Sequence, residues 1–181
     1  WNFTSVNTEI FDQESFSRWA NGPRHRLLKK RICGLVDNAM ATAYERAAKV
    51  TKRHLSSWVE KRNFSWLPEF DPFIAYLFCE LMVGRSLEGA HQYFGDVLFA
   101  LDPYRRASLI SQEVKREDNF QKGLDAKRTL ARFLDDGISP NEGEPTNAEL
   151  LITMGAFAAL PALKNVLVNI FAHISSEPTI A

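Results

Sequence analysis

Residues 71–82 read DPFIAYLFCELM, and this stretch decides the class of the fold. From Phe73 to Met82, apolar side chains occupy nearly every side of the helix that the stretch would form, which is typical of a buried helix. The Asp-Pro pair at its start is typical of an N-cap followed by a first helical position. Gly84 is typical of a helix end. We therefore expect a buried helix that begins at residue 73.

The segment before this helix predicts a long amphipathic helix over 38–62. Residues that recur at intervals of three or four predict its inward face: Met40, Tyr44, Ala47, Thr51, Leu55 and Trp58. Arg46, Lys49 and Arg53 fall on the opposite side, so we expect that side to be mostly cationic. The aromatic segment 64–70 predicts a loop that folds back onto the core.

The segment after the buried helix predicts three more helices. Ser86 is expected to cap a helix over 87–101. A second Asp-Pro pair predicts a helix over 103–117, and a further helix is expected over 123–134. No alternation of apolar and polar residues long enough for a strand is found, so the predicted class is all-α.

A linker is predicted over 135–145, where eleven residues include two Gly, two Pro and four acidic residues. Thr146 and Glu149 then predict a capping box that opens two apolar helices, over 147–160 and 162–174. These elements predict a compact multi-helix bundle followed by the first helices of a second domain.

The expected organisation has four parts. They are a basic N-terminal extension over 1–37, a helical domain over 38–134, the linker over 135–145 and the start of a second helical domain over 146–181.

Composition excludes several classes of protein. The chain has 181 residues, 45% hydrophobic content and no net charge, which excludes a disordered chain. Its two Cys residues cannot form a disulfide framework. The chain contains no glycine-rich phosphate loop and no spaced set of metal ligands, so we expect no cofactor and no metal. It also shows no catalytic constellation.

The zero net charge conceals a segregation of charge along the chain. Residues 1–62 carry twelve Lys or Arg against six Asp or Glu, whereas residues 63–104 carry one Arg against six acids. The densest basic cluster is at 24–31. Such a chain has a basic side that can bind a polyanion, although solvated helix faces with no partner produce the same pattern.

Several residues in the middle of the chain form a pattern of short motifs on consecutive predicted elements. Tyr44 and Trp58 lie on the basic-faced helix, Tyr76 on the buried helix, and Gly84-x-Ser86 in the turn that follows. The pattern resembles the N-terminal core-binding (SAM-like) domain of tyrosine recombinases and integrases, including divergent forms carried by eukaryotic mobile elements. Two family threonines are replaced: Gly89-Ala90 follows the turn, and Met40 stands four residues before Tyr44.

The resemblance implies a DNA-binding module that takes part in DNA recombination and integration. It implies contacts to duplex phosphates from Arg46, Lys49, Lys52, Arg53, Arg85, His91, Arg105 and Arg106. The partners expected from it are double-stranded DNA and further copies of the protein on that DNA, without a membrane or a small-molecule substrate. The location expected is intracellular, and nuclear in a eukaryote.

The catalytic residues of the family are not found in this chain. Its catalytic Arg, His-x-x-Arg and nucleophilic Tyr are expected further downstream, so the chain is expected to be a non-catalytic fragment or a degenerate relative. Whether the protein is an enzyme stays open at this point.

Two other classes of function remain as alternatives. One is a helical protein–protein interaction domain with an aromatic docking patch formed by Phe64, Trp66, Phe70 and Phe73. The other is a membrane-associated helical protein that uses residues 150–174, although polar residues interrupt that stretch before it reaches the length of a membrane span.

Overall fold

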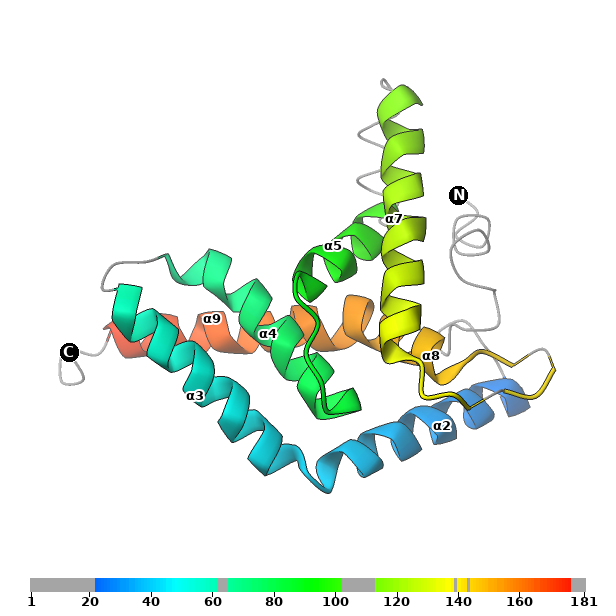
Figure 1. Ribbon diagram of the computed structural model, residues 1–181, viewed down its shortest axis with the longest axis horizontal. Helices are drawn as coiled ribbons and strands as arrows, with labels where there is room; N and C mark the ends of the chain where they lie inside the picture. The colour runs from blue at the N-terminus through cyan, green and yellow to red at the C-terminus, as the bar shows by residue number, and fades with distance from the viewer. Residues whose placement is uncertain (1–21, 62–64, 102–112, 139, 143, 177–181) are drawn as a thin grey trace.

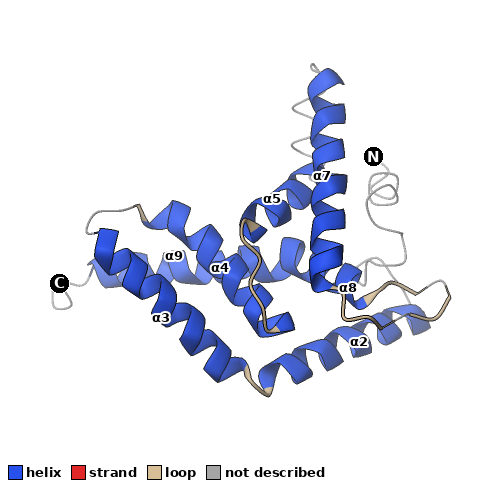
Figure 2. Cartoon of the chain, viewed as in Figure 1, coloured by secondary structure: helices blue, strands red, loops and turns tan. Residues whose placement is uncertain are grey.

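The computed structural model describes residues 22–61, 65–101, 113–138, 140–142 and 144–176. In these residues the fold is all-α, without a strand (Figure 2). Along the chain the helices are α2 (Gly22–Met40), α3 (Ala43–Lys61), α4 (Trp66–Val83), α5 (Ala90–Leu101), α7 (Glu113–Leu134), α8 (Asn147–Met154), the π-helical segment η2 (Gly155–Ala159) and α9 (Leu160–Ser176). This confirms the predicted class.

Helix α4 is the centre of the packing, as the apolar stretch predicted. It contacts α2, α3, α5 and α9, and Figure 1 shows it crossing α9. Phe73, Ile74 and Phe78 are buried. Gly84 ends the helix in the left-handed region at φ 71°, and its N–H donates to the carbonyl of Glu80.

The predicted start of α4 is wrong. The helix begins at Trp66, so most of the expected 64–70 loop is helical and Pro72 lies inside the helix instead of at its first position. Pro72 supplies no N–H for the carbonyl of Pro68, four residues earlier. The loss of this hydrogen bond is offset because the extra turns bury Phe70.

The larger hydrophobic cluster joins residues from both sides of the predicted linker. Its members come from α4, α5, α7, α8 and η2: Ala75, Phe78, Cys79, Ala90, Phe94, Val97, Ala126, Leu130, Leu134, Ala148, Leu151, Ile152 and Ala156. Residues 135–146 are non-helical in their described part, as predicted. Nevertheless, α8 and η2, expected to begin a second domain, pack into the same core as α5 and α7.

A smaller cluster lies where α3, α4 and α9 meet. Its buried members are Val50, Trp58, Phe70, Phe73 and Ile74, and side chains of α9 pack against them. Leu160 packs against both clusters, and α4 contributes residues to both. The two clusters are therefore connected through α4 and the start of α9.

The predicted helix over 38–62 is two helices in the structure. Helix α2 occupies much of the region expected to be an extension, and a turn at 41–42 separates it from α3. The predicted inward face is also wrong in part, because Met40, Tyr44 and Leu55 are exposed and Tyr44 is 87% exposed.

The face of α3 that is turned inward is a different one. It carries the buried Val50 and Trp58 together with the half-buried Arg46 and His54. The spacing of apolar residues did not predict this face, because Arg and His are classed as polar. Their apolar parts, the Arg stem and the His ring, can nevertheless pack against apolar neighbours.

Two further helix boundaries differ from prediction. Helix α5 begins at Ala90, and Ser86 is exposed in the preceding segment. Gly89 has φ 71°, which a helical residue does not adopt, so the helix cannot extend back to residue 87. Helix α7 is continuous through 118–122, where a break was expected; the start of the predicted 103–117 helix lies outside the described residues.

The capping box at Thr146 is confirmed. The N–H of Glu149 donates to Thr146 Oγ1 at 3.1 Å, and the N–H of Thr146 donates to Glu149 Oε2 at 3.0 Å.

The chain then stays helical through η2 and α9, whereas two separate helices were expected. Pro161 lacks an N–H and its ring crowds the carbonyl of Phe157, and the wider π-turn just before it accommodates this. The stretch was expected to be interrupted before it reached the length of a membrane span, but by length and composition alone the continuous helix over Asn147–Ile174 could cross a membrane, and 22% of its apolar window is buried in the structure.

Candidate functional site

The first two helices that the structure describes, α2 and α3, are together called the basic layer. Over residues 22–61 they carry ten Lys or Arg and three Asp or Glu, a surplus of seven positive charges in a chain with no net charge. In Figure 1 the two helices form a V along one edge of the molecule. The structure thus places the basic residues of 22–61 in two consecutive helices.

On α2 three cations lie on one face. Arg26, Lys29 and Lys30 are spaced by three and four residues and are all exposed. None of the three forms an ion pair with another residue in the part of the chain that the structure describes. Arg31 differs, because it donates to Glu144 and Asn147 and ties α2 to the segment before α8.

On α3 Arg46 is directed toward the end of α4. Its Nη1 donates to the carbonyls of Glu80 at 3.3 Å and Leu81 at 3.0 Å. These carbonyls belong to the last turn of a helix, where backbone donors run out and a cation is favoured; that of Glu80 also accepts from the N–H of Gly84. Arg46 therefore acts as a cap of α4.

The next two cations of α3 also contact α4. Lys49 Nζ lies 2.6 Å from Glu80 Oε1, and Arg53 stacks over Tyr76 with 5.6 Å from Cζ to the ring centroid. The Lys49 side chain nevertheless remains 74% exposed. The predicted cationic side thus faces α4, and its members have partners there.

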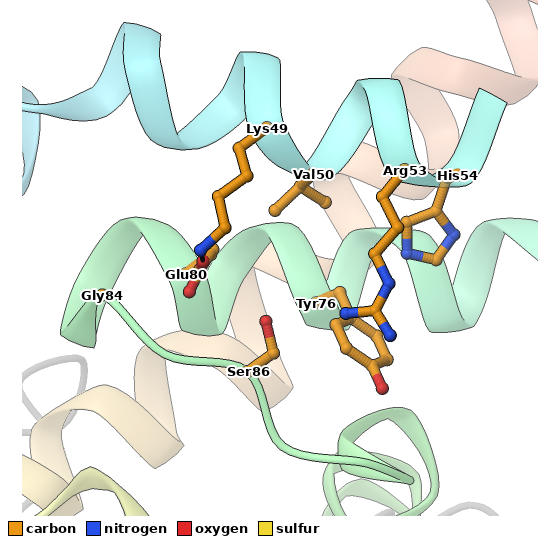
Figure 3. Close-up of a pocket in the computed structure, with 8 residues that line it drawn as sticks. All are labelled: Lys49, Val50, Arg53, His54, Tyr76, Glu80, Gly84 and Ser86. Atoms are coloured by element: carbon orange, nitrogen blue, oxygen red, sulfur yellow. Dashed lines mark hydrogen bonds and ion pairs between the residues drawn. The ribbon is translucent and has the colours of Figure 1, made fainter. Parts of the chain in front are cut away.

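These residues line a cavity of about 250 Å³ between α3, α4 and the segment after Gly84. Figure 3 shows Lys49 and Arg53 extending from α3 toward α4, with Ser86 on the other side of the space. Glu80, in the wall formed by α4, is only 3% exposed. Its second carboxylate oxygen, Oε2, is buried and accepts no hydrogen bond among the described residues.

His54 also lines this cavity and lies within a group of aromatic rings. Its ring centroid is 5.3 Å from that of Phe73 and 5.4 Å from that of Tyr76. Burial, and next the positive charge of Arg53, lower the pKa of His54 below its usual 6.5. The imidazole is therefore harder to protonate in the folded protein than in the unfolded chain.

We expect this difference to make the fold less stable in mild acid. The unfolded chain binds a proton at His54 near pH 6.5, and the folded protein does so only at lower pH. The free energy of unfolding should therefore be highest above pH 6.5 and fall as the pH drops through that window. Urea denaturation at a series of pH values measures this pH dependence of the free energy of unfolding. His54→Phe keeps a ring and should flatten the curve; an equal slope in both proteins would contradict the assignment.

The remaining predicted contacts are dispersed. Lys52 is exposed and lies on a different side of α3, where it lines a shallow groove with Leu55 and Val59. Arg85 donates to the carbonyls of Phe133 and Asp135 and stacks on the Phe133 ring, so it ties the segment after α4 to the end of α7.

His91 lines another cavity of about 310 Å³, and its Nδ1 is buried without a hydrogen-bond partner among the described residues. Arg105 and Arg106 lie outside the described residues. The structure therefore brings Arg46, Lys49 and Arg53 together and separates them from His91.

Sequence reasoning missed Glu80, which organises the α3–α4 contact. The signal was present, because Glu80 is the one acidic residue in the otherwise apolar stretch 73–82. A carboxylate buried in such a helix needs a partner.

Together these features define an all-α protein with a basic two-helix layer and a polar cavity beneath it. No protein-family model matches the chain, and no match was found among curated proteins or solved structures.

Proposed function

We propose that this chain is a DNA-binding module that contacts duplex phosphates through the basic layer. The observation that carries the proposal is the surplus of seven positive charges on two adjacent helices. Attraction to the phosphate backbone supplies most sequence-independent affinity for DNA, and it needs clustered, accessible cations. The resemblance to core-binding domains of tyrosine recombinases and integrases supports the same proposal and makes the module non-catalytic.

The phosphate contacts in this proposal differ from those first expected. Arg26, Lys29 and Lys30 are exposed on one face, and Lys52 is exposed on α3. Arg46 already caps α4, so it stabilises the fold and is not a phosphate contact. Contacts of this kind position a protein on DNA without reading its sequence.

The alternative of an aromatic docking patch keeps only part of its support, because two of its four residues are buried whereas Trp66 remains 39% exposed. Phe70 and Phe73 are buried in the smaller cluster, and Trp66 packs on Phe171 with 4.2 Å between ring centroids. Phe64 lies outside the described residues.

Removing the three α2 cations together should weaken duplex binding on all sequences. For R26A/K29A/K30A, the slope of the logarithm of the binding constant against the logarithm of the salt concentration should become shallower by about 2.7. The affinity for the duplex near 0.1 M salt should fall on the order of one hundredfold. A fluorescence anisotropy titration of a labelled duplex at several salt concentrations measures both quantities.

A triple variant of α7 provides the matched control. K122A/R128A/R132A removes the same number of exposed cations from a helix outside the basic layer. It should keep most of the affinity. Equal losses in the two variants, or no duplex binding by the unaltered protein at low salt, would overturn the proposal.

A further inference from the structure

A stripe of uncharged side chains runs along the outer side of α3. It consists of Tyr44, Ala48, Thr51, Leu55 and Val59, which lie within an arc of about 80° around the helix axis. Thr51 is half-buried and the other four are exposed, Tyr44 by 87% and Val59 by 77%. The spacing of apolar residues in α3 thus builds a face that the described part of the chain leaves uncovered. Such a face is typical of a helix that packs on a partner.

The place of α3 in the fold leaves this stripe accessible. In Figure 1 the helix lies at the edge of the molecule, and its contacts among the described residues are chiefly with α4. A shallow groove of about 600 Å³ runs along the stripe from Ala48 to Val59. A long, shallow groove on one helix fits the side chains of another helix better than it fits a small molecule, which needs a concave site.

The order of side chains along the stripe fits a second copy of the same helix. From Tyr44 to Leu55 the spacing is four, three and four residues, so it is the same in both directions. In an antiparallel pair, Tyr44 of each copy comes beside Leu55 of the other. The small residues Ala48 and Thr51 then meet in the middle, where two packed helices approach most closely. Each contact occurs twice, as a two-fold interface requires.

Two charged residues beside the stripe favour the antiparallel direction. Glu45 and Lys52 are both exposed and lie on the same flank of the stripe, within about 20° of each other around the axis. Neither forms an ion pair with another residue in the part of the chain that the structure describes. Equivalent flanks of two helices meet in an antiparallel pair and lie on opposite sides in a parallel one. Glu45 of each copy therefore comes beside Lys52 of the other, and this charge pairing sets the direction of association.

We infer that the chain forms an antiparallel homodimer through the stripe of α3, with its two-fold axis between Ala48 and Thr51. The dimer forms without DNA and does not depend on DNA binding, because the cations of α2 lie outside the stripe. Lys52 is then assigned to Glu45 of the other copy instead of to a phosphate. One helix from each copy buries less than a standard interface of about 1,600 Å², so the dimer is weak, with a Kd on the order of 10⁻⁴ M.

Sedimentation equilibrium of the full chain without DNA tests the inference. The average mass should rise from that of one chain at about 5 µM toward that of two chains at about 500 µM. Unfolding measured at the lower concentration therefore reports on the monomer, in which Tyr44 is exposed. The mass of a single chain at every concentration would overturn the inference, whether the stripe is bare or covered by another partner.

Apolar variants locate the contact on α3. Y44A/L55A should weaken dimerisation at least tenfold, because it truncates both members of the two outer contacts. V166A/I170A is the matched control, since it truncates two side chains of α9 that are 53% and 46% exposed, and it should leave dimerisation unchanged. Equal losses in the two variants would show non-specific association of apolar surfaces and would overturn the placement.

Charge reversal tests the direction of the pair. Glu45→Lys and Lys52→Glu should each weaken dimerisation about fivefold, because each turns two attractions into two repulsions. E45K/K52E restores both pairs at the same net charge and should dimerise like the unaltered chain. A double variant as weak as the single ones would overturn the antiparallel pairing.

The proposals of dimerisation and of DNA binding can fail separately. R26A/K29A/K30A keeps the stripe intact, so it should dimerise normally even where duplex binding is lost. A loss of dimerisation in this variant would contradict the assignment of the interface to α3.

Discussion

Phe94→Ala is expected to lower the free energy of unfolding by about 3–5 kcal/mol. Phe94 is 1% exposed and belongs to the larger cluster, where its ring meets that of Phe78 edge to face at 5.5 Å between centroids. It also packs closely on η2, because a Cβ added to Gly155 would lie 2.6 Å from its Cε1. Truncating it therefore opens a cavity where α4, α5 and η2 meet, and these helices have little freedom to collapse into it.

Urea denaturation followed by circular dichroism measures this loss. Tyr44→Ala is the informative control, since apolar periodicity predicts Tyr44 to be inward and the structure leaves it 87% exposed. It should change the free energy of unfolding by less than about 0.5 kcal/mol. A large loss for Tyr44→Ala, or a loss below about 1 kcal/mol for Phe94→Ala, would contradict the packing described above.

Trp58→Ala is expected to cost a similar amount, about 3–5 kcal/mol, in the smaller cluster. Trp58 is 6% exposed, and its ring lies 5.5 Å from those of Trp66 and Phe73. Its Nε1–H donates to Glu69 Oε2 at 3.1 Å, and Glu69 also pairs with Lys61. The truncation removes both the buried ring and the hydrogen bond that joins α3 to the first turn of α4.

Trp58→Phe separates the two contributions. It keeps an aromatic ring and removes the indole donor, so it should cost less than Trp58→Ala. Both variants should still unfold in one transition together with the larger cluster, because α4 and Leu160 belong to both clusters. An early, separate transition of α3 in Trp58→Ala would show instead that the smaller cluster is an independent unit.

The candidate site shows what the spacing of residues along a helix can predict and what it cannot. It predicted that Arg46, Lys49 and Arg53 share one side of α3, and all three are directed to the same part of α4. It also predicted that this side faces solvent, which is wrong for Arg46. Spacing assigns residues to a common face, but the direction of that face depends on distant groups such as Glu80.

Several features of the fold are predictable from short stretches of sequence. These are the all-α class, the buried stretch 73–82, the helix end at Gly84, the non-helical character of the described part of 135–145 and the capping box at Thr146. The helix end and the capping box follow from backbone hydrogen bonds and steric limits within a few residues of the chain, and the burial of 73–82 follows from its apolar composition. Such local forces act in the same way wherever the segment lies in the fold.

Three other features depend on tertiary contacts: which face of α3 is buried, where α4 begins and how α8 joins the core. The last carbonyls of α4 and the carboxylate of Glu80 attract cations from α3, which turns Arg46 and Lys49 toward α4 and leaves Tyr44 exposed. Burial of Phe70 continues α4 back past Pro72. These outcomes are set by contacts between residues far apart in sequence, whose free energies exceed local preferences of about 1 kcal/mol.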